Sequence, residues 1–94
     1  MADSARARMH LVIRGRVQGI GFRFAASDEA SAMGLTGWVR NRPGGEVEII
    51  AEGRRETLQM LAKWANSGPR MARVESVAEE WSEFADEFAD FRIR

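Results

Sequence analysis

Two stretches of the chain carry apolar residues at the spacing of an α-helix. The clearer one begins near residue 54, repeats at i, i+3, i+4 and i+7, and ends at Gly68-Pro69, a typical helix stop. The other covers residues 22–33 and ends at Gly34. The apolar positions are Leu58, Leu61, Ala62 and Ala65 in the first, and Phe22, Ala25, Ala26, Ala30 and Met33 in the second. The pattern predicts two amphipathic helices with their apolar stripes in the core.

Short segments rich in β-branched, aliphatic or aromatic residues lie around these helices and are typical of strands. The predicted strands are residues 9–15, 35–41, 47–52 and 74–81, with a short last strand at 91–94. Arg42-Pro43-Gly44-Gly45 predicts a hairpin turn, because proline fixes one φ and the glycines allow positive φ. We expect the charged strand 74–81 to lie at a sheet edge and residues 84–90 to form an acidic loop.

The order strand, helix, strand, strand, helix, strand predicts an α+β, ferredoxin-like (βαββαβ) sandwich. In this arrangement two helices cover one face of an antiparallel sheet, to which a short extra C-terminal strand is added. We expect residues 9–94 to form a single domain. Residues 1–8 are small and polar, without the apolar core of a signal peptide, and predict a flexible N-terminus and a cytoplasmic protein. The fold itself hosts many unrelated activities.

Composition excludes several kinds of chemistry. The 94 residues contain no cysteine and a single histidine, His10, so disulfides, thiol nucleophiles and multi-histidine metal sites are excluded. No catalytic partner can be assigned to His10, which favours a packing role in the first strand. No apolar run is long enough to span a membrane. We expect a monomer with no metal and no cofactor.

Charge points to a small anionic ligand and away from nucleic acid. Lysine and arginine together number 14, as do aspartate and glutamate. Residues 1–47 nevertheless hold seven arginines against four acids, whereas residues 74–91 hold seven acids and no base. RNA-reading domains of this fold place aromatic residues on the central strands. The corresponding positions here are aliphatic: Leu11, Val12, Ile13, Val47, Ile49 and Ile50.

The strongest candidate for a ligand-binding site in the sequence is residues 15–23 (Gly-Arg-Val-Gln-Gly-Ile-Gly-Phe-Arg). Glycines let successive backbone N–H groups converge on an anion. A helix that begins near Phe22 adds the unpaired amides of its first turn, and Arg23 adds a planar fork of donors. The stretch predicts an anion cradle. The glycines alone also fit a simple turn followed by a surface arginine.

Two common phosphate loops do not fit these residues. The P-loop requires Gly-Lys-Ser/Thr, whereas Lys63 is the single lysine of the chain. The dinucleotide fingerprint matches Gly19 and Gly21 but requires glycine or alanine where Phe24 stands. No nucleotide-binding fold is indicated.

Two separated stretches resemble the signatures of the acylphosphatase family. Residues 13–23 (Ile-Arg-Gly-Arg-Val-Gln-Gly-Ile-Gly-Phe-Arg) look like the first signature. Residues 37–41 (Gly-Trp-Val-Arg-Asn), continuing through Gly45, Val47 and Gly53, resemble the second. Further similarity at residues 68–69, 72–74 and 91–93 extends the resemblance over nearly everything after Met9. Gly44 departs from the pattern, since the family commonly has aspartate there.

The resemblance implies an acylphosphatase, which hydrolyses the carboxyl-phosphate bond of an acyl phosphate to a carboxylate and inorganic phosphate without a metal. It implies that Asn41 positions the attacking water. The phosphoryl group, and inorganic phosphate or sulfate as ligands, would be bound by the Arg23 side chain and the loop amides of Gln18, Gly19, Ile20, Gly21, Phe22 and Arg23. A carboxylate leaving group needs no general acid, which agrees with the scarcity of histidine and cysteine.

Other interpretations remain open at this point. Its place before a tight turn favours a turn-forming role for Asn41. A non-catalytic anion sensor would keep the cradle but need no water-positioning residue, so Asn41 argues against it. A maturation module, similar to the acylphosphatase-like domains of larger carbamoyl-transferring enzymes, would depend on a partner; the lack of a linker or second domain favours a stand-alone enzyme.

Overall fold

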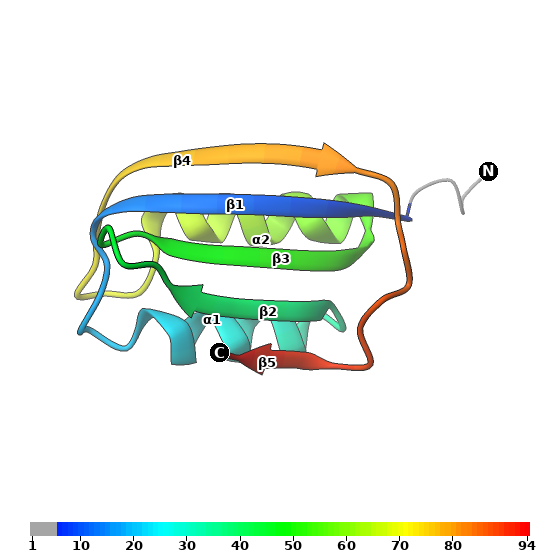
Figure 1. Cartoon of the computed structure of the whole chain (residues 1–94), viewed down its shortest axis with the longest axis horizontal. Coiled ribbons are helices and arrows are strands. Elements are labelled where there is room, and N and C mark those ends of the chain that lie inside the picture. The colour runs from blue at the N-terminus through cyan, green and yellow to red at the C-terminus, as the bar shows by residue number, and fades with distance from the viewer. Residues whose placement is uncertain (1–5) are drawn as a thin grey trace.

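The computed structural model describes residues 6–94, and within this range the chain forms five strands and two helices (Figure 1). In chain order they are β1 (Arg6–Arg16), α1 (Phe22–Ala32), β2 (Thr36–Asn41), β3 (Val47–Arg54), α2 (Arg55–Ser67), β4 (Arg73–Ser82) and β5 (Phe91–Ile93). The predicted elements and their order are confirmed. Residues 6–8 belong to β1, because they pair with β3 and Ala7 is buried, whereas the sequence suggested a flexible terminus for residues 1–8. Residues 1–5 lie outside the described range.

The sheet has the strand order β4-β1-β3-β2-β5. β1 pairs antiparallel with β3 and β4, and β2 pairs antiparallel with β3, while the charged strand β4 lies at an edge as expected. The short strand β5 runs parallel to β2 and makes the sheet mixed. The reason is topological. β4 ends where β2 begins, the chain crosses that end of the sheet, and β5 therefore enters in the direction of β2 (Figure 1).

A buried carboxylate holds this crossing in place. Glu52 on β3 is 1% exposed, and its two oxygens accept hydrogen bonds from the backbone N–H groups of Ala85 (2.7 Å) and Glu87 (3.0 Å). Between them, Asp86 has a φ of 54°, the only positive φ of a non-glycine residue within 6–94. Backbone donors compensate the cost of burying the charge. Glu52 thereby fixes residues 83–90 across the end of the sheet and guides the chain into β5.

Both helices lie on one face of the sheet (Figure 1), and the apolar core fills the space between the helices and the sheet. Side chains alternate along each strand, so every second residue of β1 and β3 points into this core. Its largest fully buried apolar members are Phe22, Met9, Leu11, Ile13, Ile49, Leu58, Leu61, Val17, Val39 and Val47. The ring centres of Phe22 and Trp64 lie 5.4 Å apart, so the two side chains pack α1 against α2. The start of α1 is thus anchored by Phe22.

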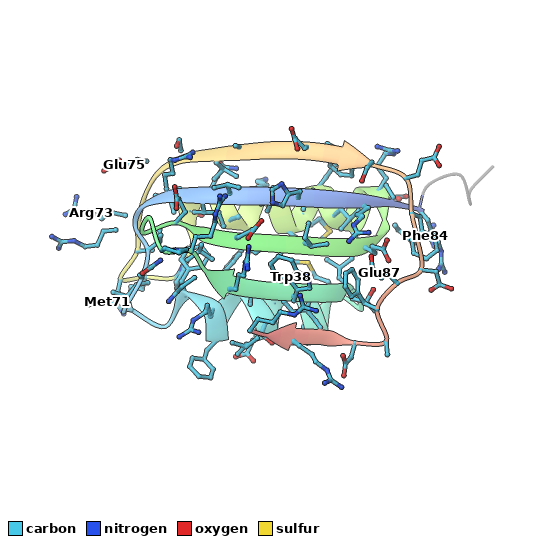
Figure 2. The ribbon with its side chains drawn as sticks, in the orientation of Figure 1. Trp38, Met71, Arg73, Glu75, Phe84 and Glu87 are labelled. Carbon is cyan, nitrogen blue, oxygen red and sulfur yellow. The ribbon has the colours of Figure 1, made fainter. Side chains whose placement is uncertain are left out.

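The opposite face of the sheet carries a network of charged and aromatic side chains (Figure 2). Glu48 on β3 lies between His10 and Arg40: Nε2 of His10 is 2.7 Å from Oε2, and Nε of Arg40 donates to Oε1 at 2.6 Å. Burial raises the pKa of Glu48, but the hydrogen bonds with His10 and Arg40 outweigh burial and bring this pKa below its usual value. The guanidinium groups of Arg40 and Arg94 lie 5.3 and 4.9 Å from the Trp38 ring centre.

We expect Glu48→Gln to lower the melting temperature at neutral pH, and the difference from wild type to shrink in acid. A carboxyl whose pKa is depressed by folding contributes stability that is fully present above its unfolded pKa, about 4.3. That contribution is lost as the pH falls through the lower, folded pKa. Thermal melts from neutral to about pH 3 check this, with the exposed Glu75→Gln as control. A constant difference over the whole range would contradict the role of Glu48.

Candidate active site

The end of β1, the start of α1 and the end of β2 meet at one end of the sheet, at the left of Figure 1. Residues 17–21 connect β1 to α1. Val17 and Phe22, which are 1% and 2% exposed, hold the two ends of this connection in the core. The residues between them are therefore anchored on both sides.

Gly19 and Gly21 adopt the left-handed backbone conformation, with φ of 77° and 82°. Residues with a side chain rarely take this conformation. A Cβ at either position would meet no atom within 4 Å, so their requirement for glycine is one of backbone angle and not of space. The open space beside them leaves the loop backbone accessible to a ligand.

Gly15, the remaining glycine of residues 15–23, has a role in the sheet and not in the loop. Gly15 lies inside β1 with a φ of 132°, where the register between β1 and β4 shifts. A Cβ there would collide with the carbonyl oxygen of Arg73 on β4. Gly15 thus allows a bulge and a close approach of two strands, and the cradle is shorter than the sequence suggested.

The first turn of α1 faces this loop with its backbone amides free of capping. Gly21 is the N-cap residue, no side chain caps the helix, and the first turn contains no acidic residue. The first amides of a helix have no acceptor within it, and the helix dipole places partial positive charge at the same point. This end of α1 is therefore electrostatically suited to an anion.

Arg23 extends from the first turn of α1 and is half-buried. Its Nη1 donates a hydrogen bond of 3.2 Å to the backbone oxygen of Arg94, which the parallel strand β5 brings beside α1. This contact orients the Arg23 side chain. A guanidinium has several further donors in one plane, so most of them remain available for a ligand.

A small hollow of about 70 Å³ brings five of the seven predicted site residues together. It is lined by Val17, Gly19, Gly21, Phe22, Arg23, Phe24 and Asn41. Asn41 enters it from the end of β2, where it pairs with Val47. The hollow is several times smaller than the pockets of roughly 300–1,000 Å³ that hold drug-sized ligands. The hollow therefore suits a small group and not a nucleotide.

Two of the predicted residues have side chains placed elsewhere. Ile20 packs against the core, and neither Ile20 nor Gln18 lines the hollow. The amide of Gln18 points to the β2–β3 hairpin, where Nε2 donates to the carbonyl oxygens of Arg42 (2.8 Å) and Glu46 (2.9 Å). Any contribution of Gln18 and Ile20 to anion binding must come from the backbone.

Comparison with known proteins decides the family. The sequence model of the acylphosphatase family matches residues 9–93. The chain belongs to the acylphosphatase family. It is 47% identical to the acylphosphatase of Anaeromyxobacter dehalogenans over 94 residues, covering 100% of this chain and 99% of that protein. It is 46% identical to that of Pelotomaculum thermopropionicum, covering 95% and 97%. The structure of an acylphosphatase from Coxiella burnetii matches with a TM-score of 0.92 at 34% identity, over 100% of this chain and 98% of that one.

Two features of the hollow were not predicted by the sequence. Phe24 lines the hollow and is 65% exposed. It is not among the apolar positions that helical spacing places in the core, so the pattern predicted no role for it. The contact between Arg23 and Arg94 joins residues far apart in the chain and depends on the direction of β5. A short terminal strand of alternating residues does not specify its partner strand.

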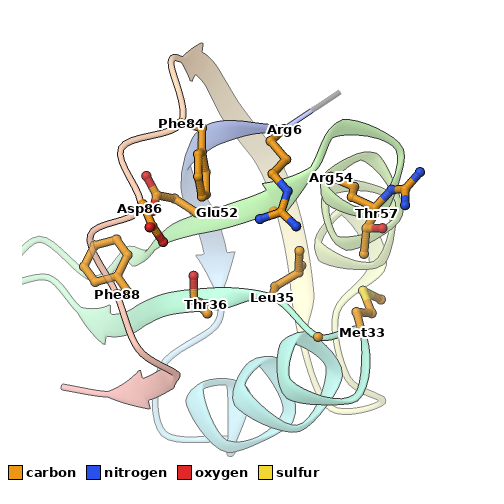
Figure 3. Close-up of a pocket in the computed structure, with 12 residues that line it drawn as sticks. Arg6, Met33, Leu35, Thr36, Glu52, Arg54, Thr57, Phe84, Asp86 and Phe88 are labelled. Carbon is orange, nitrogen blue, oxygen red and sulfur yellow. The ribbon is translucent and has the colours of Figure 1, made fainter. Parts of the chain in front are cut away.

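A second hollow of about 170 Å³ lies at the opposite end of the sheet (Figure 3). It has Arg6 and Arg54 on its walls, but also the carboxylates of Glu52 and Asp86. Opposite charges side by side do not favour an anion. Within residues 6–94, no group of three or more His, Cys, Asp or Glu side chains is placed to hold a metal ion. In the same range no helix is long and apolar enough to cross a membrane.

Proposed function

We propose that this acylphosphatase hydrolyses acyl phosphates in the hollow between α1 and β2, with Arg23 and the amides of residues 18–23 as phosphate ligands and Asn41 as the residue that positions water. The observation that carries the proposal is that Gly19, Gly21, Arg23 and Asn41, from three segments, line one small hollow. A phosphate ligand and a water ligand side by side are what hydrolysis of a phosphoryl group requires.

Binding of the phosphoryl group follows from the donors around the hollow. The loop and the first turn of α1 offer backbone N–H groups, and Arg23 offers two parallel donors to two phosphate oxygens. The transition state of phosphoryl transfer spreads negative charge over the equatorial oxygens. Donors fixed in advance at these oxygens stabilise that charge without reorganisation.

Asn41 supplies the second requirement. Its side-chain amide is half-buried and has no hydrogen-bond partner among residues 6–94, so its oxygen is available to accept from water and its NH₂ to donate to phosphate. The water oxygen bonds to phosphorus while the bond from phosphorus to the acyl oxygen breaks, and its electron pair leaves with the carboxylate. The proton of the water passes to a phosphate oxygen. No general acid is needed, because a carboxylate is a good leaving group.

We expect benzoyl phosphate hydrolysis to continue at an unchanged rate in EDTA, and inorganic phosphate and sulfate to inhibit competitively. The physical reason is that the donors of the hollow recognise a tetrahedral oxyanion directly. Steady-state rates with and without chelator, and at several phosphate concentrations, check this.

The same assay separates this proposal from the alternatives. A rate that disappears in EDTA and returns with Mg²⁺ would contradict direct binding by the protein. Phosphate binding without any turnover would indicate an anion sensor on the same fold. Activity that appears only after a partner protein is added would indicate a maturation module.

A further inference from the structure

The side chain of Gln18 links the glycine loop, residues 17–21, to the hairpin at residues 42–46. No backbone hydrogen bond joins these two described segments directly. Gln18 lies in the loop that carries Gly19 and Gly21, whereas the carbonyls it binds belong to the hairpin that follows Asn41. One NH₂ group donates both bonds, at 2.8 Å to Arg42 and 2.9 Å to Glu46. The side chain is half-buried, so water competes only in part for these bonds.

The two carbonyls belong to the hairpin, directly beyond Asn41 and Val47, the last pair of the β2–β3 ladder. The backbone N–H of Arg42 donates to the carbonyl of Glu46 at 2.8 Å, and the N–H of Gly45 donates to the carbonyl of Arg42 at 3.1 Å. Each carbonyl therefore accepts one bond from the hairpin and one from Gln18. Asn41 directly precedes Arg42 in the chain, and its ladder partner Val47 directly follows Glu46, so a shift of these carbonyls is expected to shift Asn41.

We infer that Gln18 is a positioning residue, whose side-chain amide holds Asn41 at the correct distance from the phosphate cradle. The inference rests on the proposed function of Arg23 and Asn41. Gln18 acts here on the water through Asn41 and does not contact the substrate with its side chain.

The cradle does not need this side chain for its own shape. Val17 and Phe22 anchor both ends of the loop in the core, and the left-handed angles of Gly19 and Gly21 define its path. The hairpin, in contrast, projects beyond the core, with Pro43 and Gly44 exposed. Loss of the Gln18 amide is therefore expected to shift Asn41 and to leave the phosphate ligands in place.

The test is Gln18→Met, which keeps the length of the side chain and removes its donors. The protein is expected to fold, since both carbonyls retain their hairpin bonds. We expect kcat for benzoyl phosphate to fall on the order of tenfold to a hundredfold, as small misplacements of reacting groups do. The dissociation constant of inorganic phosphate, from calorimetric titration, should stay within about twofold. Gln18→Asn keeps the amide but is too short to reach both carbonyls, so it should also lower kcat and leave the dissociation constant of phosphate unchanged.

A double-mutant cycle identifies the route of the effect. In an Asn41→Ala background, Gln18→Met should lower kcat by no more than about twofold further, because the group that it positions is already absent. Asn66→Ala is the matched control: it also removes a side-chain amide that donates to a carbonyl, that of Ala62 in α2, and should leave kcat near wild type.

Four outcomes would overturn the inference: an unchanged kcat in Gln18→Met, a fall in kcat matched by Asn66→Ala, a full further loss in the Asn41→Ala background, or a large loss of phosphate affinity. An inactive wild-type protein would instead contradict the proposed function. An active wild type with an impaired Asn41→Ala and an unaffected Gln18→Met would contradict the role of Gln18 alone.

Discussion

Asn41→Ala is expected to abolish most turnover while the protein still folds and binds phosphate. The glycine loop, the first turn of α1 and Arg23 are unchanged by this substitution, so the phosphate ligands stay in place. The attacking water loses the group that orients it, and orientation contributes several kcal/mol to such reactions. We expect kcat to fall by roughly a thousandfold, about 4 kcal/mol in the activation barrier. Steady-state rates on benzoyl phosphate and calorimetric titration with phosphate measure the two quantities separately.

The competing role of Asn41 as a turn former predicts the reverse. In that case Asn41→Ala would lower the melting temperature and leave the kcat of the folded fraction near normal. Asn41→Asp provides a further comparison, because its shape is the same but a carboxylate would repel the phosphate. We expect this variant to lose phosphate affinity as well as kcat, whereas the alanine variant loses kcat alone.

Arg23→Lys is expected to fail almost as badly as Arg23→Ala. A lysine keeps the positive charge, but a single ammonium cannot offer two parallel, coplanar donors to two phosphate oxygens. We expect kcat/KM to fall on the order of a hundredfold or more, about 3 kcal/mol of transition-state stabilisation. In contrast to the change at Asn41, phosphate affinity should fall together with the rate.

Arg16→Lys is the matched control for this prediction. Arg16 is the exposed last residue of β1, close to the same end of the sheet, but it does not line the hollow. Its replacement should leave kcat/KM within about twofold of wild type, as for other surface substitutions. An Arg23→Lys variant within about fivefold of wild type would show that position 23 needs only a point charge.

The order of the elements was predictable because the periods of a helix and a strand differ and each leaves its own spacing of apolar residues. Leu58, Leu61 and Ala65 face the core for this reason. The conformation of the glycine loop was predictable in part, since φ > 0 at Gly19 and Gly21 is a local demand of the backbone. Gly15 was assigned to the cradle by the same reasoning, but its close approach to Arg73 belongs to a pairing with β4, far away in the chain.

The two helices, the strands, the hairpin at residues 42–45 and the family could be predicted from the sequence, because these depend on local spacing and on residue type. The contacts around the hollow, in contrast, depend on how distant segments pack. The chain crossing that Glu52 holds sets the direction of β5, and this direction brings the backbone oxygen of Arg94 to Arg23. The hydrogen bonds of Gln18 cross from one loop to another and join residues 24 and 28 positions apart. Such contacts follow from packing of distant segments, and no pattern along the chain encodes which carbonyl a flexible amide will reach.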